Sequence, residues 1–350
     1  MNTLVLEKSA LKNNISRVKE LAGSSYIYVN LSGDGYGAGA VSLALLLREE
    51  GIRRFAVDSA EGASALRKAG LVDEDILMLH STSDATTLER LADQNIICSV
   101  GTLEAGMALN ALAERRATVV EAHLEIDCGT GFGGFPAEEP EKIVSLIRNL
   151  NNVAFSGVYT QMSSGRALEQ QLSVFQQAVE FIQNAGCETG IVHAAGSYAL
   201  LHSELTHLDA VRAGSILLGR CRRSRGDELM LVGHGEAPID SVRWLPKGHT
   251  VGNEKKVTLR SPTRVAVLPV GYQHGLGVER TPSNLLEALR RFFAHRRRTV
   301  RINGQKARVL GTPGATETLI NVTGLKCGEG DLATFEIDPM YAKGFKREYR

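Results

Sequence analysis

Short apolar runs alternate with amphipathic stretches along roughly the first two thirds of the chain. A short strand at Leu4–Glu7 and a helix at Ala10–Ala22 are followed by eight such runs: Ile27–Leu31, Phe55–Val57, Ile76–Leu79, Ile97–Val100, Ala122–Ile126, Ala154–Val158, Ile191–His193 and Asp209–Val211. Helical periodicity fills most of the intervals between them. Eight strands alternating with helices predict an α/β fold, and a closed (β/α)8 barrel more than an open doubly wound sheet. In such a barrel, functional residues lie at the carboxyl ends of the strands.

The pattern changes from about Gly226. Short alternating runs, including Met230–Val232, and turns such as Asn303-Gly304 replace the helical periodicity and predict a β-rich second domain. We place the boundary near Arg222–Arg225, which gives a barrel domain over 1–224 and a β-rich domain over 225–350. The first strand, 4–7, is a candidate to pack with the second domain.

An arginine-rich segment interrupts the second domain. Leu285, Leu286 and Leu289 precede a run of arginines, and residues 283–296 read as an inserted amphipathic helix. A phosphate or nucleic-acid patch is one interpretation of this segment. A solvated helix or a docking face is favoured over it.

Composition narrows the class of protein. Lys+Arg number 40 against 39 Asp+Glu, so overall charge gives no reason to expect a nucleic acid or a membrane as partner. The five cysteines are odd in number and lack CxxC spacing, which indicates reduced thiols in a cytoplasmic protein. The N-terminus lacks the features of a signal peptide, and no metal-site signature is found. We expect a soluble, cytoplasmic protein.

The stretch from Tyr28 to Gly39 is the strongest local signal for chemistry. A β-type run there ends in a glycine-rich turn, and a helix follows from about Val41 to Glu50. The unpaired N–H groups and the positive dipole end of that helix suit a phosphate. Glycine spacing alone is equally compatible with a plain tight turn between a strand and a helix.

Six motifs in this order resemble the alanine racemase family, and the similarity runs essentially end to end. They are Leu6-Glu7-Lys8-Ser9 with the helix that follows, Gly35-Tyr36-Gly37-Ala38-Gly39, Glu125-Ile126-Asp127-Cys128-Gly129, His193-Ala194-Ala195-Gly196-Ser197, Val211-Arg212-Ala213-Gly214 and Val267-Leu268-Pro269-Val270-Gly271-Tyr272. The resemblance implies a fold type III protein with a pyridoxal-phosphate-holding (β/α)8 barrel and a C-terminal β domain. It also implies a head-to-tail homodimer in which each active site is completed by the partner subunit.

The resemblance assigns roles to individual residues. Cofactor-binding positions that hold the phosphate match Tyr36, Ser197, Gly214 with Ser215, and Tyr349. Arg212 matches the arginine facing the pyridine nitrogen, and Tyr272 matches a racemisation base supplied across the dimer. Asp127 and His193 lie in matching strand-end motifs. Structural alternatives remain for the tyrosines, as packing aromatics, and for Arg212, as an ion-pair partner.

The chain departs from the family pattern around the same pocket. Ser32 stands where the family has its Schiff-base lysine, and serine cannot form that bond. Glu125 and Phe132 replace a lysine and an arginine, Gln161 replaces a histidine, and the loop over 311–316 lacks the family's closing residues. Racemisation on pyridoxal phosphate needs an amine and a base on each face of the substrate carbon. The cofactor is therefore expected to bind non-covalently, if at all.

Three functions remain open. The favoured one is a racemase-like protein without ordinary racemase activity that binds pyridoxal phosphate, or a small phosphorylated or amino-acid ligand. The second is an isomerase or lyase of altered mechanism, with Glu125, Cys128, His193 and Tyr272 as acid-base candidates beside Ser32. The third is a pseudoenzyme subunit that pairs with an active racemase in a heterodimer. Cys128 has no second thiol opposite it, and the lone histidines His80 and His274 are more often structural.

Overall fold

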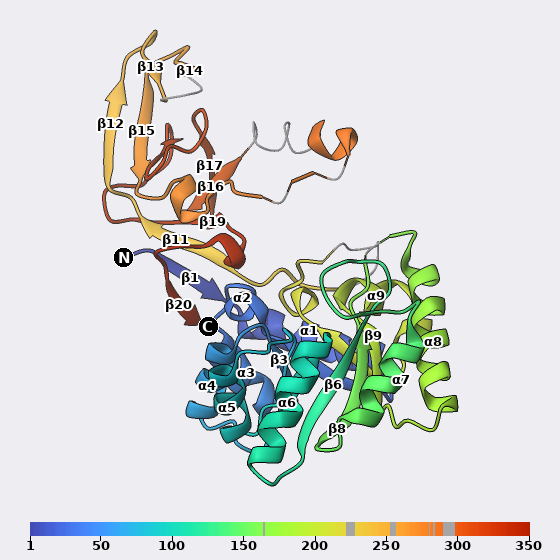
Figure 1. The fold of residues 1–350 in the computed structure, drawn as a ribbon. Helices are drawn as coiled ribbons and strands as arrows, with labels where there is room; N and C mark the ends of the chain where they lie inside the picture. The colour runs from blue at the N-terminus through green and yellow to red at the C-terminus, as the bar shows by residue number, and fades with distance from the viewer. Residues whose placement is uncertain (164, 222–227, 253–256, 280, 283, 290–297) are drawn as a thin grey trace. The chain divides into compact units, whose positions relative to one another are not determined.

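The computed structural model describes residues 1–163, 165–221, 228–252, 257–279, 281–282, 284–289 and 298–350 (Figure 1). The chain forms two compact units. One is Ser9–Leu231, and the other combines Met1–Lys8 with Val232–Arg350. The boundary expected near Arg222–Arg225 lies outside the described residues.

The unit Ser9–Leu231 is built on a closed ring of parallel strands. The ring runs in the order β4-β3-β2-β10-β9-β8-β6-β5, and a parallel bridge between Leu77 and Ile97 joins its two ends. At that junction Met78 N donates a hydrogen bond of 2.9 Å to Ile97 O. The strands are β2 (Tyr26–Asn30), β3 (Arg54–Val57), β4 (Asp75–Met78), β5 (Cys98–Val100), β6 (Val120–Asp127), β8 (Val153–Thr160), β9 (Ile191–Ala195) and β10 (Ala210–Ala213), with β7 (Phe135–Pro136) paired to β6. The predicted barrel is confirmed.

Amphipathic helices cover the outside of this ring (Figure 1). Their apolar faces pack on the strands while their polar faces meet solvent, which fixes the order of strand and helix. Side-chain caps begin three of them, since the oxygens of Ser59, Asp84 and Thr102 each accept a backbone N–H of the first turn. The helices are α1 (Lys8–Ala22), α3 (Ala40–Glu49), α4 (Ala60–Lys68), α5 (Ala85–Asp93), α6 (Leu103–Arg115), α7 (Pro140–Asn149), α8 (Leu168–Asn184) and α9 (Ser197–His202).

A left-handed turn follows β2, where the sequence predicted a glycine-rich turn. The segment α2 (Ser32–Tyr36) has φ angles of 62° at Gly33, 55° at Asp34, 65° at Gly35 and 56° at Tyr36. Glycine reaches this region without steric cost, whereas aspartate and tyrosine do so rarely. Two non-glycine residues are therefore held in a strained conformation at the carboxyl end of a barrel strand.

The other unit is a nine-stranded sheet in the order β12-β15-β18-β17-β16-β19-β11-β1-β20. Strand β1 (Thr3–Leu6) lies antiparallel to β11 and parallel to β20, so the two ends of the chain meet in one sheet. The others are β11 (His234–Pro238), β12 (Ser241–Leu245), β15 (Thr263–Leu268), β16 (Thr299–Ile302), β17 (Gln305–Val309), β18 (Thr318–Asn321), β19 (Leu332–Glu336) and β20 (Lys346–Tyr349), besides the separate pair β13 (Thr250–Val251) and β14 (Val257–Thr258).

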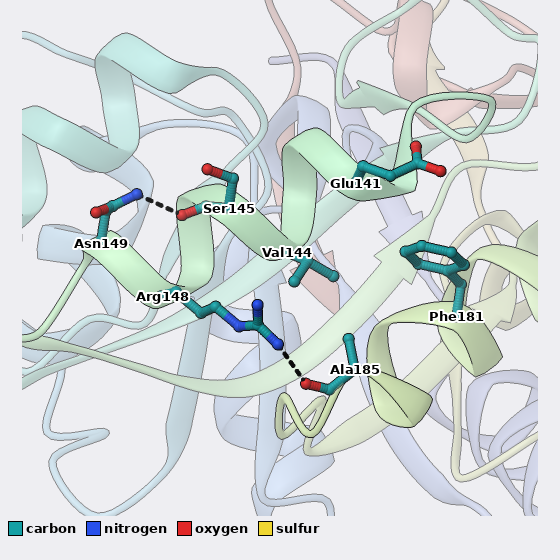
Figure 2. Close-up of a pocket in the computed structure, with 7 residues that line it drawn as sticks. All are labelled: Glu141, Val144, Ser145, Arg148, Asn149, Phe181 and Ala185. Carbon is teal, nitrogen blue, oxygen red and sulfur yellow. Dashed lines mark hydrogen bonds between the residues drawn. The ribbon is translucent and has the colours of Figure 1, made fainter.

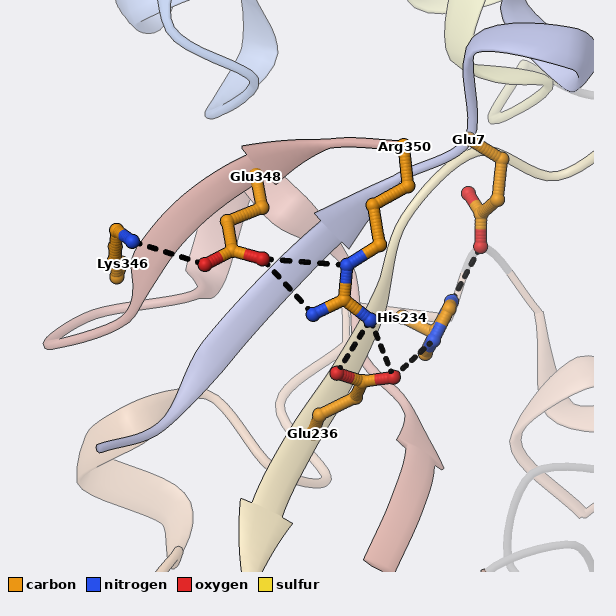
Figure 3. Close-up of polar contacts among 6 residues, drawn as sticks. All are labelled: Glu7, His234, Glu236, Lys346, Glu348 and Arg350. Carbon is orange, nitrogen blue, oxygen red and sulfur yellow. Dashed lines mark hydrogen bonds and ion pairs between the residues drawn. The ribbon is translucent and has the colours of Figure 1, made fainter. Parts of the chain in front are cut away.

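A chain of charged groups fastens the termini within this sheet (Figure 3). His234 Nδ1 contacts Glu7 Oε1, and Arg350 Nη1 donates to both oxygens of Glu236 at 3.0 and 2.8 Å. Arg350 Nη2 also pairs with Glu348 at 2.9 Å. The hydrogen bond to Glu7 is the largest cause that raises the pKa of His234. The His234–Glu7 contact also links the start of β11 to the residue that follows β1.

Two predicted segments, Met230–Val232 and the helix over 283–296, are only partly matched by the described structure. Met230–Val232 forms no strand, because Asn14 instead bonds the backbone of Met230 through both its amide nitrogen and its oxygen. Of the helix expected over 283–296, residues 285–289 are helical, and 290–296 lie outside the described residues. None of the helices that the structure describes is long and apolar enough to cross a membrane.

Candidate functional site

Ser32 begins the left-handed turn at the carboxyl end of β2, in the ring of strand ends that we call the barrel mouth. Its hydroxyl donates to Asn30 Oδ1 at 2.6 Å, and its backbone N–H donates to the same oxygen at 2.9 Å. The next N–H, that of Gly33, donates to Asp58 Oδ2 at 2.8 Å. Ser32 is thus fixed by the last residue of its own strand, in the geometry of a turn closed by an asparagine side chain.

Tyr36, Ser197 and Gly214 are brought together at this mouth. A methyl group placed on Gly214 would lie 2.5 Å from the Tyr36 hydroxyl, so the tyrosine rests directly on the glycine backbone. Ser197 Oγ accepts the N–H of Gly214 at 2.9 Å and that of Ile216 at 3.3 Å. Asn30 Nδ2 donates to the Tyr36 hydroxyl at 3.3 Å. Two hydroxyls and the backbone of the β10 end form one polar cluster, with Ser215 next in the chain.

A chain of hydrogen bonds runs through the barrel interior behind this cluster. Arg212 Nη1 donates to His193 Nδ1 at 2.8 Å, and His193 Nε2 lies 2.9 Å from His123 Nδ1. Since the guanidinium can only donate, His193 accepts at Nδ1 and donates from Nε2 to His123. Tyr28 and Tyr159 each stack on the His193 ring, at centroid distances of 5.4 and 5.2 Å.

Burial determines the protonation states of the two histidines in this series of hydrogen bonds. Burial first, and the neighbouring Arg212 second, lower the pKa of His123 to about 3 and hold the pKa of His193 well below its usual value. Both imidazoles are therefore neutral at physiological pH. Arg212 is 3% exposed, and its other terminal nitrogen donates to Thr160 O at 2.5 Å. Arg212 is a fixed cation with neutral support rather than an ion-pair partner.

Glu125 lies at the same end of the barrel, on β6. Burial raises the pKa of its carboxyl, while the charges of Arg212 and His80 act in the opposite direction. Two residues further on, Asp127 organises the glycine-rich loop after β6: its Oδ1 accepts the N–H groups of Gly129 and Thr130, and its Oδ2 accepts that of Gly131. Asp127 thus orders the loop.

Two further predicted positions follow from β6. Cys128 is buried, and burial raises the pKa of its thiol to about 11, so the thiol is protonated at neutral pH. That protonation argues against the role of nucleophile or base considered for it. Phe132 is 90% exposed in the loop and contributes no polar group to the barrel mouth.

Tyr272 and Tyr349 belong to the other unit. Tyr272 opens a short 3-10 helix, is 48% exposed, and its N–H donates to Gly314 O at 2.9 Å. It lines a cavity of about 390 Å³ together with the loop from Thr312 to Glu317. Tyr349 ends β20, opposite Leu6 of β1. The roles that the resemblance gives to these tyrosines stay predictions.

Sequence reasoning missed His123, Tyr28, Tyr159 and Asn30. For His123, the available signal was the period-two alternation along β6, which places it on the same face of the strand as Glu121, Glu125 and Asp127. A separate hollow of about 410 Å³ lies between α7 and α8, where Arg148 Nη2 donates to Ala185 O at 2.7 Å (Figure 2). It holds none of the predicted site residues. No group of three His, Cys, Asp or Glu side chains in the described residues could hold a metal ion.

The architecture matches solved proteins along its whole length. The alanine racemase from D-cycloserine-producing Streptomyces lavendulae superposes with a TM-score of 0.86 at 21% identity, covering 100% of this chain and 97% of that one. A structure from Bartonella henselae, described as alanine racemase with covalently bound pyridoxal phosphate, gives 0.83 at 19% identity over 100% and 99% of the two chains. These define the class: a parallel eight-stranded barrel with a C-terminal β domain.

Sequence comparison identifies the family. The family profile described as alanine racemase, N-terminal domain, matches residues 6–221, and the one described as alanine racemase, C-terminal domain, matches 226–337. An alanine racemase from Carboxydothermus hydrogenoformans is 32% identical over 276 residues, 76% of this chain and 74% of that protein. The chain belongs to the alanine racemase family.

The lysines of the barrel unit lie on its helices and not on its strands or on the turns that follow them. Residues 9–231 contain lysine at positions 12, 19, 68 and 142. All four are on the covering helices α1, α4 and α7. Lys12 pairs with Glu50 at 2.8 Å, Lys19 donates to Glu50 O at 2.6 Å, and Lys142 pairs with Glu139 at 2.7 Å. None of them follows a barrel strand.

Proposed function

We propose that this protein binds pyridoxal phosphate, or a small phosphorylated or amino-acid ligand, non-covalently at the barrel mouth and lacks ordinary racemase activity. One observation carries the proposal: Ser32, fixed to Asn30, occupies the turn after β2, while the lysines of the barrel unit lie on outer helices. A hydroxyl cannot replace the amine that holds the cofactor covalently in a racemase.

The polar cluster supports binding of the cofactor's phosphate. The Tyr36 and Ser197 hydroxyls and the backbone of Gly214 lie together, with glycine where any side chain would collide with Tyr36. Because Ser197 Oγ already accepts two N–H groups, its own hydrogen is directed outward to donate to an anion. Hydroxyl and backbone donors suit a phosphate.

Arg212 supplies the second part of the site. When bound, pyridoxal phosphate provides a pyridine ring and an aldehyde that draw electrons from an amino acid. Arg212 stays charged while His193 and His123 stay neutral behind it, so it presents a donor and not an acid to the ring nitrogen. Held this way, it orients the ring and moves no proton.

The remaining acid-base groups do not complete a two-base mechanism. Racemisation needs a base on each face of the substrate carbon. Tyr272 is the family's candidate on one face. Ser32 on the other is a weak base at neutral pH, and its hydrogen is directed to Asn30. The head-to-tail dimer that would bring a partner's tyrosine to this mouth stays a prediction.

Equilibrium dialysis with pyridoxal phosphate, combined with a polarimetric assay on L-alanine, tests the proposal. We expect saturable binding, no racemisation above buffer containing the free cofactor, and about tenfold weaker binding in Tyr36→Phe, the loss of one hydrogen bond to a charged group. Tyr26→Phe is the matched control, since Tyr26 is at the opposite end of β2. Racemase turnover, or the absence of saturable binding, would overturn the proposal.

A further inference from the structure

Glu125 occupies a space at the barrel mouth that only glycine backbones leave open. A methyl group on Gly101, after β5, would lie 2.9 Å from Glu125 Oε2, and one on Gly133 would lie 3.3 Å from the same oxygen. Asp127 holds the loop that carries Gly133 in place. The carboxylate is therefore half-buried, beneath a backbone that contributes no side chain.

The surrounding hydroxyls offer this carboxylate one shared hydrogen among the described residues. Tyr159 is the polar side chain that hydrogen-bonds Glu125, and its hydroxyl also donates to Leu79 O at 2.8 Å. Its neighbour Ser99, 2.9 Å away, donates to Met78 O at 2.7 Å. Two hydrogens thus serve two carbonyl oxygens and the carboxylate, so Tyr159 is only a shared donor for Glu125.

The nearby cations do not contact it directly. Arg212 acts on Glu125 through space, but its two terminal nitrogens donate to His193 and to Thr160 O. His80 acts in the same sense while its Nδ1 lies 2.7 Å from Asp58 O, and Asp127 adds negative charge. Among the residues that the structure describes, Glu125 therefore has one shared hydroxyl and no contacting cation, which leaves this half-buried carboxylate electrostatically incomplete.

The position of Glu125 links it to the phosphate cluster. Neighbouring strands run in the order β2-β10-β9-β8-β6, and Arg212 on β10 interacts electrostatically with Tyr36, which follows β2, and with Glu125 on β6. The cluster and the carboxylate therefore lie at one mouth, on either side of Arg212.

We propose that Glu125 is the subsite for a ligand's ammonium group, so that this protein selects phosphorylated pyridines carrying an amine over those carrying a hydroxyl. The inference rests on the proposed function, because the ligand's phosphate is held at Tyr36, Ser197 and Gly214. An ammonium group supplies a contacting positive charge and donors that need not be shared with a backbone carbonyl. An aldehyde strengthens binding by forming a Schiff base with a lysine, which Ser32 cannot do. An amine-bearing ligand can instead be held by its charge, without a covalent bond.

Two probes that differ in one group test the inference. Pyridoxamine 5′-phosphate and pyridoxine 5′-phosphate share the ring and the phosphate and differ in an ammonium against a hydroxyl. We expect the intact protein at pH 7 to bind the amine about tenfold more tightly, the increment of one charge-assisted hydrogen bond. Glu125→Gln should abolish the preference, and Glu121→Gln, the same change at the exposed start of β6, should preserve it.

A second measurement needs no variant. Because burial raises the pKa of the Glu125 carboxyl, lowering the pH should protonate it before an ordinary exposed glutamate titrates, and the ratio of the two affinities should fall towards one. The phosphate titrates alike in both probes and cancels in the ratio. Equal affinities at pH 7, or a ratio independent of pH, would overturn the ammonium subsite and leave the proposed function standing. Failure of both probes and of pyridoxal phosphate to bind would overturn the proposed function and the inference with it.

Discussion

The Ser32 hydroxyl donates a 2.6 Å hydrogen bond to Oδ1 of Asn30, two residues earlier at the end of β2. This bond fixes the residue that the family resemblance aligns with the Schiff-base lysine, and the same asparagine donates through Nδ2 to Tyr36. One side chain therefore connects Ser32 to the polar cluster of Tyr36, Ser197 and Gly214. The turn is ordered around a serine.

Adding a methyl group to Gly214 should weaken phosphate binding. In Gly214→Ala the new Cβ would fall 2.5 Å from the Tyr36 hydroxyl and displace it from the cluster. We expect affinity for pyridoxal phosphate to fall at least about tenfold, the loss of one charge-assisted bond. Gly196→Ala is the matched control, because nothing lies within 4 Å of its added Cβ. Equal affinities of the two variants by equilibrium dialysis would contradict the phosphate cluster.

Cys128 should resist alkylation in the folded protein. A thiol pKa of about 11 leaves roughly one hundredth of the thiolate that an ordinary cysteine has near pH 8. Iodoacetamide labelling followed by peptide mass mapping should therefore modify the partly exposed Cys187 first, with Cys128 about 100-fold slower. In urea the two rates should converge. Rapid labelling of native Cys128 would revive its role as a reactive group.

The buried histidine pair should make stability depend on pH. The pKa of His123 is about 3 in the folded protein and near 6.5 when unfolded, so the unfolded chain binds an extra proton as the pH falls below 6.5. The contribution of the neutral His123 to the free energy of unfolding is fully present above pH 6.5. It is lost as the pH falls towards 3, at up to about 1.4 kcal/mol per pH unit. As the pH falls from 8 to 5, the free energy of unfolding should decrease less steeply in His123→Gln than in the wild type. If urea unfolding gave the same pH dependence of the unfolding free energy for both proteins, that result would argue against a neutral His123.

The sequence predicts the scaffold well because burial on both faces makes each barrel strand an apolar run. Phe55–Val57 and Ile76–Leu79 become β3 and β4 with boundaries shifted by at most one residue. It predicts the conformation at Ser32 poorly. The turn with positive φ angles at Asp34 and Tyr36 is held by a hydrogen bond from Asn30 to Tyr36 and one from the Gly33 N–H to Asp58, and no periodicity contains them.

The interior of the site is predictable only in part. Arg212 and His193 are found by the family motifs, but their hydrogen bond to each other and the link to His123 depend on three strands meeting in the ring. Likewise, the pairing of β1 with β20 joins residues separated by the whole chain, and nothing local in either strand predicts that register.

Introducing a lysine at position 32 should create a covalent attachment site for pyridoxal phosphate. Ser32→Lys places an amine beside the phosphate cluster, and pyridoxal phosphate followed by borohydride reduction should leave one stable adduct on that residue. Ser32→Ala should leave none. Racemase activity of the lysine variant should remain at least about 100-fold below that of a racemase, since the other positions around the pocket stay altered. An unmodified lysine variant would show that position 32 does not face the bound cofactor.

The most direct test of the central claim is the same reduction applied to the unaltered protein. The chain is saturated with pyridoxal phosphate, treated with borohydride, denatured and weighed by intact mass spectrometry, followed by peptide mapping. The account predicts saturable binding before reduction and an unmodified barrel unit after it. A stoichiometric reduced adduct on any lysine of residues 9–231 would contradict non-covalent binding at this site.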